Sequence, residues 1–152
     1  MPNGFTGVVL RVNLTTGEIV RQEMPEEFYR AYLGGGAMGA YFLLTETAPA
    51  LDPLDPGNVL TIAPSVTTGS AISGVSRCSA VALSPVTGAV GEGQVGGKIG
   101  PMIKRAGFDA IVVAGRAERL SYLLVEEDTV SICDASDLSG RQVSEVCSFF
   151  EQ

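Results

Sequence analysis

Histidine and tryptophan are both absent from the 152 residues of this chain. Histidine is the commonest general base and neutral metal ligand, so its absence excludes Ser–His, Cys–His and zinc-bound histidine mechanisms within the chain. Basic residues are also few, with 10 lysines and arginines against 17 acids and a net charge of −7. A nucleic-acid-binding protein needs a basic face to replace the counterions of the phosphates, so we expect no nucleic-acid partner.

No apolar run approaches the roughly 20 residues of a membrane-spanning helix. The sparse basic residues argue against an electrostatic membrane anchor, and the N-terminus lacks the basic and apolar regions of a signal peptide. The three cysteines, Cys78, Cys133 and Cys147, form no C-x-x-C motif, which excludes zinc-ribbon, thioredoxin-like and self-contained iron–sulfur motifs. We therefore expect reduced, core-packed thiols in a soluble cytoplasmic protein without a membrane partner.

The apolar content of the chain is sufficient for one folded domain over residues 1–152. Hydrophobic residues make up 45% of the chain and charged residues 18%, and a chain of this length buries roughly 68–70% of its unfolded surface. The first half predicts a strand hairpin over residues 7–23 with Gly17 in its turn. A helix is expected from Pro25, with Phe28, Tyr32 and Leu33 buried. A second helix from Met38 and a strand over residues 59–63 follow.

The second half of the chain repeats this order. It predicts a strand over residues 79–83, a turn at 87–88, a glycine-rich lead-in at 91–97, a helix over 98–106 and a strand over 109–114. We therefore predict an α+β, β-rich domain of two pseudo-two-fold related halves, about residues 7–64 and 77–133. Each half is expected to run hairpin, Gly-Gly, helix, strand. A second hairpin over residues 120–133, with its turn at 126–128, and a weak helix from Ser144 complete the prediction.

Paired glycines before a helix have two interpretations. In the structural one, a glycine ends the preceding element in a left-handed conformation and its neighbour permits close packing. In the functional one, the bare N–H groups at the start of the helix bind an anion. Two such pairs, Gly35-Gly36 and Gly96-Gly97, would suit a flat phosphate-bearing ligand, with Arg77 as a bidentate donor. Alternatively, Arg77 is a solvated side chain before a strand.

Residues 91–96 match the formal pattern G-x-G-x-x-G. The nucleotide-binding mechanism of that pattern requires a strand–helix crossover and an acidic residue about 20 positions further on. The helix expected here is short, and the nearby acids, Asp109 and Glu118, fall before a strand and in a loop. A Rossmann-type nucleotide site is therefore disfavoured.

A set of short motifs runs in a fixed order along nearly the whole chain. They read GVVLRVNLTTG at residues 7–17, YLGG at 32–35, AP at 63–64, TG at 68–69, SPVTG at 84–88, GGKIGP at 96–101 and AGFDAI at 106–111. Together they resemble the N-terminal domain of the aldehyde ferredoxin oxidoreductase family, the tungsten (sometimes molybdenum) bis-pterin enzymes. The resemblance implies a domain of two related β-rich halves that forms the base for two pterins, whose phosphates are bridged by magnesium.

The resemblance also implies which residues bind the cofactor, and it implies no catalytic residue or metal ligand in this chain. Arg77 matches the family arginine between a pterin and the iron–sulfur cluster. Gln94, Val95, Gly96 and Gly97 match a segment that usually reads Asn-Ser-Gly-Gly and contacts the phosphates. The chain departs from the family where Gly36-Ala37 replaces Arg-Gly, where Gln94 is one methylene longer than asparagine, and where Val95 lacks a hydroxyl. The predicted cofactor-binding residues are Gly35, Gly36, Arg77, Gln94, Val95, Gly96 and Gly97.

In this family the cluster cysteines and the acid–base groups lie in later helical domains, and we expect the chain to end before them. The resemblance therefore implies the cofactor-binding part of an enzyme that oxidises an aldehyde to a carboxylate with electrons passing to ferredoxin. These residues alone are expected to be inactive. The expected partners are the helical remainder or a separate subunit and, through it, ferredoxin; the isolated chain is expected to self-associate. Two alternatives stay open, namely a non-catalytic scaffold or binding module with the same fold and, more weakly, a free-standing nucleotide-phosphate binder.

Overall fold

The structure, a computed structural model, describes residues 4–126 and 129–150. In chain order its elements are β1 (Val8–Asn13), β2 (Ile19–Glu23), α1 (Glu26–Tyr32), α2 (Gly35–Glu46), β3 (Leu60–Pro64), β4 (Cys78–Leu83), β5 (Val90–Val95), α3 (Ile99–Arg105), β6 (Ala110–Ala114), β7 (Ser121–Val125), β8 (Val130–Asp134), the 3₁₀ turn η1 (Ser136–Leu138) and α4 (Val143–Phe150). The predicted α+β class is confirmed.

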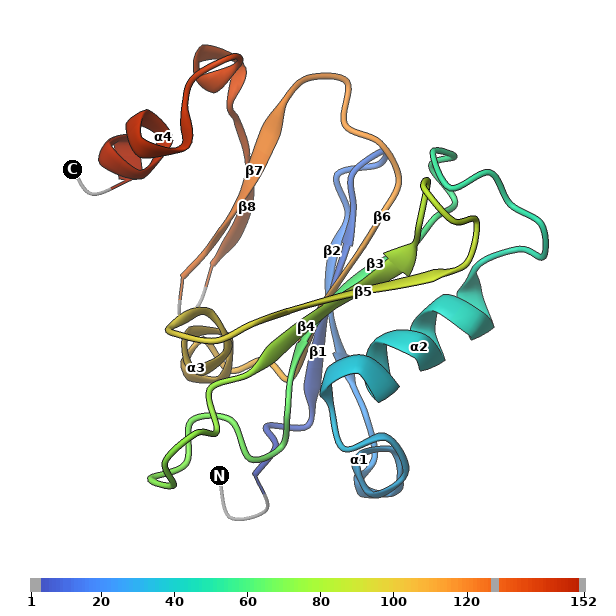
Figure 1. The fold of residues 1–152 in the computed structure, drawn as a ribbon, viewed down its shortest axis with the longest axis vertical. Coiled ribbons are helices and arrows are strands. Elements are labelled where there is room, and N and C mark those ends of the chain that lie inside the picture. Colours follow the sequence, from blue (N-terminus) through green and yellow to red (C-terminus); the bar gives the residue numbers. More distant parts are fainter. Residues whose placement is uncertain (1–3, 127–128, 151–152) are drawn as a thin grey trace.

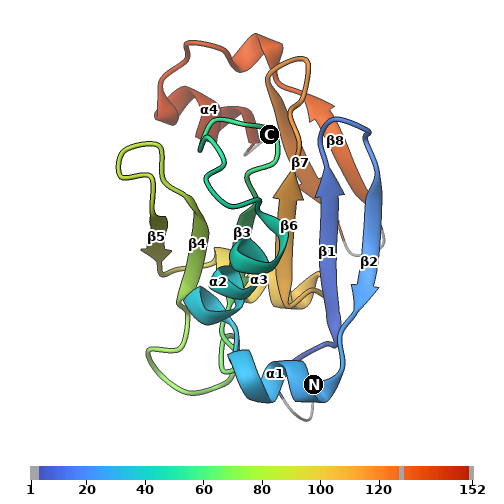
Figure 2. The same ribbon diagram turned by 90° about the vertical axis from the view of Figure 1, so that its right-hand side faces the viewer.

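A six-stranded sheet of order β2-β1-β6-β3-β4-β5 forms the centre of the molecule. Helices α1 and α2 cover one face, while α3 and the separate hairpin β7–β8 lie on the other (Figures 1 and 2). The predicted hairpins are confirmed, and Gly17 has the positive φ of 74° that the turn between β1 and β2 requires. Residues 127–128 of the second predicted turn lie outside the described residues.

The two halves of the chain contribute symmetrically to the order of the strands. Exchanging β1 with β4, β2 with β5 and β3 with β6 gives the same order read from the opposite edge of the sheet. The strand directions differ, however, because β6 is parallel to β1 whereas β3 is antiparallel to β4. Helix length explains the difference: the 12 residues of α2 span about 18 Å and carry the chain back across the sheet. The 7 residues of α3 span only about 10 Å. They leave the chain at the same end of the sheet at which β5 ends.

Three sequence-based expectations about local structure are wrong. The helix expected from Met38 begins at Gly35, so Gly35 and Gly36 lie in its first turn and not before it. Residues 91–97 do not simply lead into a helix, because Val90–Val95 pair with β4 along their whole length as the edge strand β5. The G-x-G-x-x-G pattern therefore lies mainly in a strand and lacks the strand-to-helix loop of a nucleotide site. The buried residues of α1 are Phe28 and Tyr29; Leu33 instead caps the helix in a left-handed conformation and is 59% exposed.

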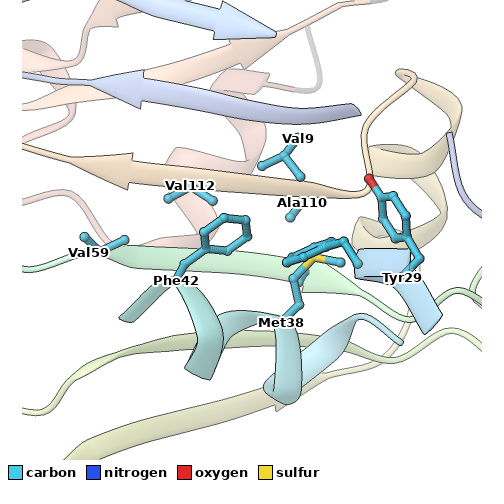
Figure 3. Close-up of a cluster of buried hydrophobic side chains, with 9 residues drawn as sticks. Val9, Tyr29, Met38, Phe42, Val59, Ala110 and Val112 are labelled. Atoms are coloured by element: carbon cyan, nitrogen blue, oxygen red, sulfur yellow. The ribbon is translucent and has the colours of Figure 1, made fainter. Parts of the chain in front are cut away.

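Apolar side chains alternate between the two faces of the central strands. Val9 and Val112 face α1 and α2, whereas Leu10 and Ile111 face α3, as the period of two in a strand requires. The first cluster also holds Tyr29, Met38 and Phe42 (Figure 3). At Gly39 an added Cβ would lie 2.5 Å from a methyl carbon of Val81, so the missing side chain allows α2 to pack closely on β4.

A buried ion pair joins the end of α3 to the start of β6. The ammonium of Lys104 lies 2.5 Å from a carboxylate oxygen of Asp109, and the two side chains are 2% and 1% exposed. The Asp109 carboxylate also accepts hydrogen bonds from Thr6 and from the backbone N–H of Gly7, and Lys104 donates to the carbonyl of Gly4. Burial alone raises the pKa of Asp109, but the Lys104 contact and the bonds from Thr6 outweigh it, so the pKa is lowered.

Replacing Asp109 with Asn is expected to lower the free energy of unfolding by about 3–5 kcal/mol, because the Lys104 ammonium would remain buried without a counter-charge. Urea unfolding followed by circular dichroism measures the change. The matched control is Glu26→Gln, which breaks the exposed ion pair with Arg30 and is expected to cost less than about 0.5 kcal/mol. Equal losses in the two variants would contradict a dominant role for the buried pair.

Acidification is expected to remove the contribution of Asp109 to stability. Because folding lowers the pKa of this carboxyl, its stabilisation is complete above the unfolded-state value of about 3.9 and is lost as the pH falls through the folded-state value. The difference in urea midpoint between the wild type and Asp109→Asn is therefore expected to shrink between about pH 5 and pH 2. A difference that stays constant over this range argues against the linkage.

Candidate functional site

The seven predicted residues border the β4–β5 strand pair at one edge of the main sheet. Arg77 immediately precedes β4, and Cys78, the first residue of β4, pairs with Val95, the last residue of β5. Gly96 and Gly97 follow β5, so they lie at the same end of the strand pair as Arg77. An added Cβ at Gly96 would lie 3.7 Å from the hydroxyl oxygen of Ser76. The structure therefore brings Arg77 and the second glycine pair together.

Strand geometry separates Gln94 from Val95. Gln94 lies directly opposite Ser79, on the face of the sheet that α2 covers, because an added Cβ at Gly35 of α2 would lie 3.6 Å from the hydroxyl oxygen of Ser79. Successive side chains of a strand point to opposite faces, so Val95 faces the α3 side. Gln94 thus lies near the first glycine pair, and the Val95 side chain does not.

The start of α2 lies beside an acid that the sequence does not single out. A Cβ added at Gly36 would lie 2.5 Å from a carboxylate oxygen of Glu92 in β5. That oxygen accepts hydrogen bonds from the Ser79 hydroxyl at 2.9 Å and from the Gln94 side-chain amide at 3.0 Å. The signal for Glu92 is its i, i+2 spacing from Gln94, which places both on one face only when the segment is recognised as a strand.

The small-residue loop between β3 and β4 is closed by one buried threonine. The hydroxyl of Thr68 accepts from the backbone N–H of Ser65 and donates to the carbonyl of Arg77, both at 3.0 Å. An added Cβ at Gly100 in α3 would lie 3.0 Å from the methyl carbon of Thr68. Thr68 therefore fixes the backbone of Arg77 and contacts the first turn of α3.

Gly97 is the most open of the predicted glycines. Its φ is +88°, and apart from its two chain neighbours no described residue has an atom within 4 Å of a Cβ built on it. The Arg77 side chain is exposed, and within residues 4–126 and 129–150 no hydrogen bond or ion pair involves its guanidinium. This end of the strand pair thus presents a cation and open backbone, a combination that fits an anionic group such as a phosphate.

The cysteines and acids add no metal centre to this site. Among the described residues, no group of three or more His, Cys, Asp or Glu side chains is placed to hold a metal ion. Cys78 is buried, and burial raises the pKa of its thiol. Cys133 is half-buried and Cys147 is exposed on α4, so core packing is the wrong prediction for Cys147.

None of the helices in the described ranges has the length and apolar character needed to span a bilayer.

Comparison with known proteins decides the family. The family model described as aldehyde ferredoxin oxidoreductase, N-terminal domain, matches residues 9–152. The chain belongs to the aldehyde ferredoxin oxidoreductase family. The tungsten-containing aldehyde ferredoxin oxidoreductases of Pyrococcus furiosus and Thermococcus kodakarensis are 41% and 43% identical over 142 residues, which cover 93% of this chain and 24% of each relative. The chain therefore spans about a quarter of the length of these relatives.

The chain is also similar to two further proteins. The aliphatic sulfonate oxidoreductase, WOR-like subunit, of Pyrococcus furiosus is 32% identical over 90% of this chain and 22% of its own length. The structure also resembles the active site complex BamBC of benzoyl coenzyme A reductase, solved with 1,5-dienoyl-CoA, with a TM-score of 0.94 and 33% identity. That likeness covers 98% of this chain and 23% of the solved chain. The expected fold family is thus confirmed by sequence and by structure.

Replacing Thr68 with Val is expected to lower the free energy of unfolding by about 1–3 kcal/mol, because the N–H of Ser65 and the carbonyl of Arg77 both lose their partner. Hydrogen exchange at the Ser65 amide is expected to become faster. Thr67→Val is the matched control, since Thr67 is exposed and its change should stay within about 0.5 kcal/mol. Unchanged Ser65 exchange in Thr68→Val would show that the hydroxyl does not close the loop.

Proposed function

We propose that this chain is the N-terminal cofactor-binding part of a tungsten-dependent oxidoreductase that converts an aldehyde to a carboxylate. Water and the aldehyde yield the carboxylate and three protons, while two electrons pass through an iron–sulfur cluster outside these residues to ferredoxin. Two findings support the proposal: the family match covers residues 9–152, and relatives about 40% identical are tungsten-containing aldehyde ferredoxin oxidoreductases. The chain itself supplies binding groups, and no catalytic residue is assigned to it.

The convergence of Arg77 with Gly96 and Gly97 at one end of the β4–β5 pair carries the proposal. A guanidinium beside open backbone matches the phosphates of a bis-pterin cofactor. Gln94 of β5 adds a side-chain amide group. The tungsten or molybdenum bis-pterin group with its bridging magnesium, when bound, supplies the two-electron oxidation. Arg77 and the glycines would bind and orient its phosphates, and Thr68 would hold the Arg77 backbone in place.

We further propose that residues 1–152 act as one platform domain with the half-repeats described above. Its partner is the helical part that carries the cluster, either in the same chain or as a separate subunit. Without that part, the face beside α2 and β5 is left uncovered, and the isolated domain is expected to self-associate.

The three free cysteines support a cytoplasmic location, since the cytoplasm keeps thiols reduced.

One observation favours a second candidate, a non-catalytic scaffold that keeps the fold. The carboxylate of Glu92 lies where a side chain at Gly36 would point, so an acid faces the start of α2. A negative charge there disfavours a second phosphate contact at Gly35 and Gly36. A scaffold would dock to the same partners but hold neither pterin nor metal.

The decisive experiment is to purify the chain assembled with its cluster-binding part and measure tungsten, molybdenum and pterin. The Arg77→Ala variant is expected to lower the pterin content about tenfold or more, because a charge-assisted bond to phosphate contributes about 1.5–3 kcal/mol. Arg119→Ala is the control, since its ion pair with Asp134 lies on the β7–β8 hairpin. Equal pterin content in the two variants would contradict the assigned site, and a metal-free, pterin-free wild-type assembly would favour the scaffold.

A further inference from the structure

We propose that an apolar groove between α3 and the β7–β8 hairpin is a self-complementary surface, which binds the same groove of a second copy of this chain. The groove lies on the face of the main sheet that carries α3, opposite the face that α1 and α2 cover (Figure 1). The proposal does not use the cofactor-binding residues, so it stands or falls independently of the proposed function.

The groove is an apolar cavity of about 680 Å³, and nine of its eleven lining residues are apolar. Ile62 of β3 with Ile111 and Val113 of β6 lie between the two walls. One wall is α3, and the other is formed by Leu123 and Val125 of β7. An open apolar surface of this kind marks a place where another molecule binds, because water against it costs free energy.

Two large side chains of α3 project beside this hollow. Ile99 and Met102 both line the groove, yet they are 44% and 54% exposed. They lie three residues apart and therefore on the same face of the helix. A two-fold arrangement of two copies would bring this pair from each copy into the hollow of the other, because each residue of such an interface meets its counterpart site in both directions.

The two charged residues of the groove make the second copy the occupant that fits. Arg105 belongs to the α3 wall, with its guanidinium 4.0 Å from the Met102 sulfur, and Glu126 follows β7 on the opposite wall. Within residues 4–126 and 129–150, neither takes part in an ion pair. A two-fold axis parallel to the groove places the α3 wall of each copy against the hairpin wall of the other. Arg105 of each copy then faces Glu126 of the other.

This pairing of charges also distinguishes the groove from the other apolar surfaces of the chain. Each copy carries a net charge of −7, so two copies repel each other at long range. A contact that pairs an arginine with a glutamate twice offsets part of this repulsion, whereas a contact between apolar side chains alone does not.

Sedimentation velocity of the 152-residue chain over a dilution series tests the proposal. The wild type is expected to form a dimer that dissociates on dilution. Arg105→Glu and Glu126→Arg each place like charges together twice in the dimer, so each is expected to weaken dimerisation about tenfold or more. Both residues are exposed, and circular dichroism checks that the fold persists. Arg30→Glu on α1 is the matched control, because it changes the net charge by the same amount as Arg105→Glu.

Mixing the two charge-reversal variants gives the sharpest result. Arg105→Glu and Glu126→Arg chains are expected to dimerise with each other about as tightly as the wild type, because both contacts then join opposite charges. An Arg105–Glu126 contact within one chain would not produce this recovery. A wild type that stays monomeric at every concentration would overturn the proposal, and so would a mixture that associates no better than its components.

A pair of apolar substitutions tests which face of the sheet associates. Met102→Ser removes a side chain that projects beside the groove and is expected to weaken the dimer. Leu44→Ser is the control, since Leu44 is 73% exposed on α2, on the opposite face of the sheet, and it should leave dimerisation unchanged. Weakening by Leu44→Ser but not by Met102→Ser would assign the association to the α2 face and refute the groove.

Discussion

The buried carboxylate of Asp109 is the contact on which the rest of the structure depends. It joins the segment before β1 to the last turn of α3 and the start of β6, which lie about 100 residues further along the chain. A buried charge without these partners would be strongly destabilising, so the three segments must meet when the chain folds. Their meeting places β6 beside β1 in the centre of the sheet and anchors α3, whose first turn follows Gly96 and Gly97.

The candidate site lies at the edge strand β5, among glycines that have no side chain. Gly35, Gly36 and Gly97 leave backbone or neighbouring polar groups accessible, so shape comes from absent side chains and chemistry comes from a few polar ones. Arg77 and Glu92 give the two parts of the site opposite charge.

Much of the fold is predictable from local patterns. The alternating strands, the Gly17 turn and the proline-started helix α1 all occur where the sequence predicts them, because turn conformation and helix capping depend on nearby residues. Strand β5 is not predictable in this way. Its sequence, with Gly91, Gly93 and two polar residues, has little strand preference of its own, and pairing with β4 supplies the hydrogen bonds that make it a strand.

The candidate site is likewise predictable from the sequence only in part. By itself, the sequence determined the family and the alternation of secondary structure, and it named Arg77 and Gly96-Gly97 as candidates, because motif spacing and side-chain chemistry are local properties. Only the tertiary structure decided that Gln94 and Val95 face opposite sides of the sheet, and that Glu92 reaches Ser79, Gln94 and Gly36. The physical reason is that these contacts depend on the register of β4 against β5 and on the packing of α2 over both strands. That packing brings together residues more than 40 positions apart in the sequence.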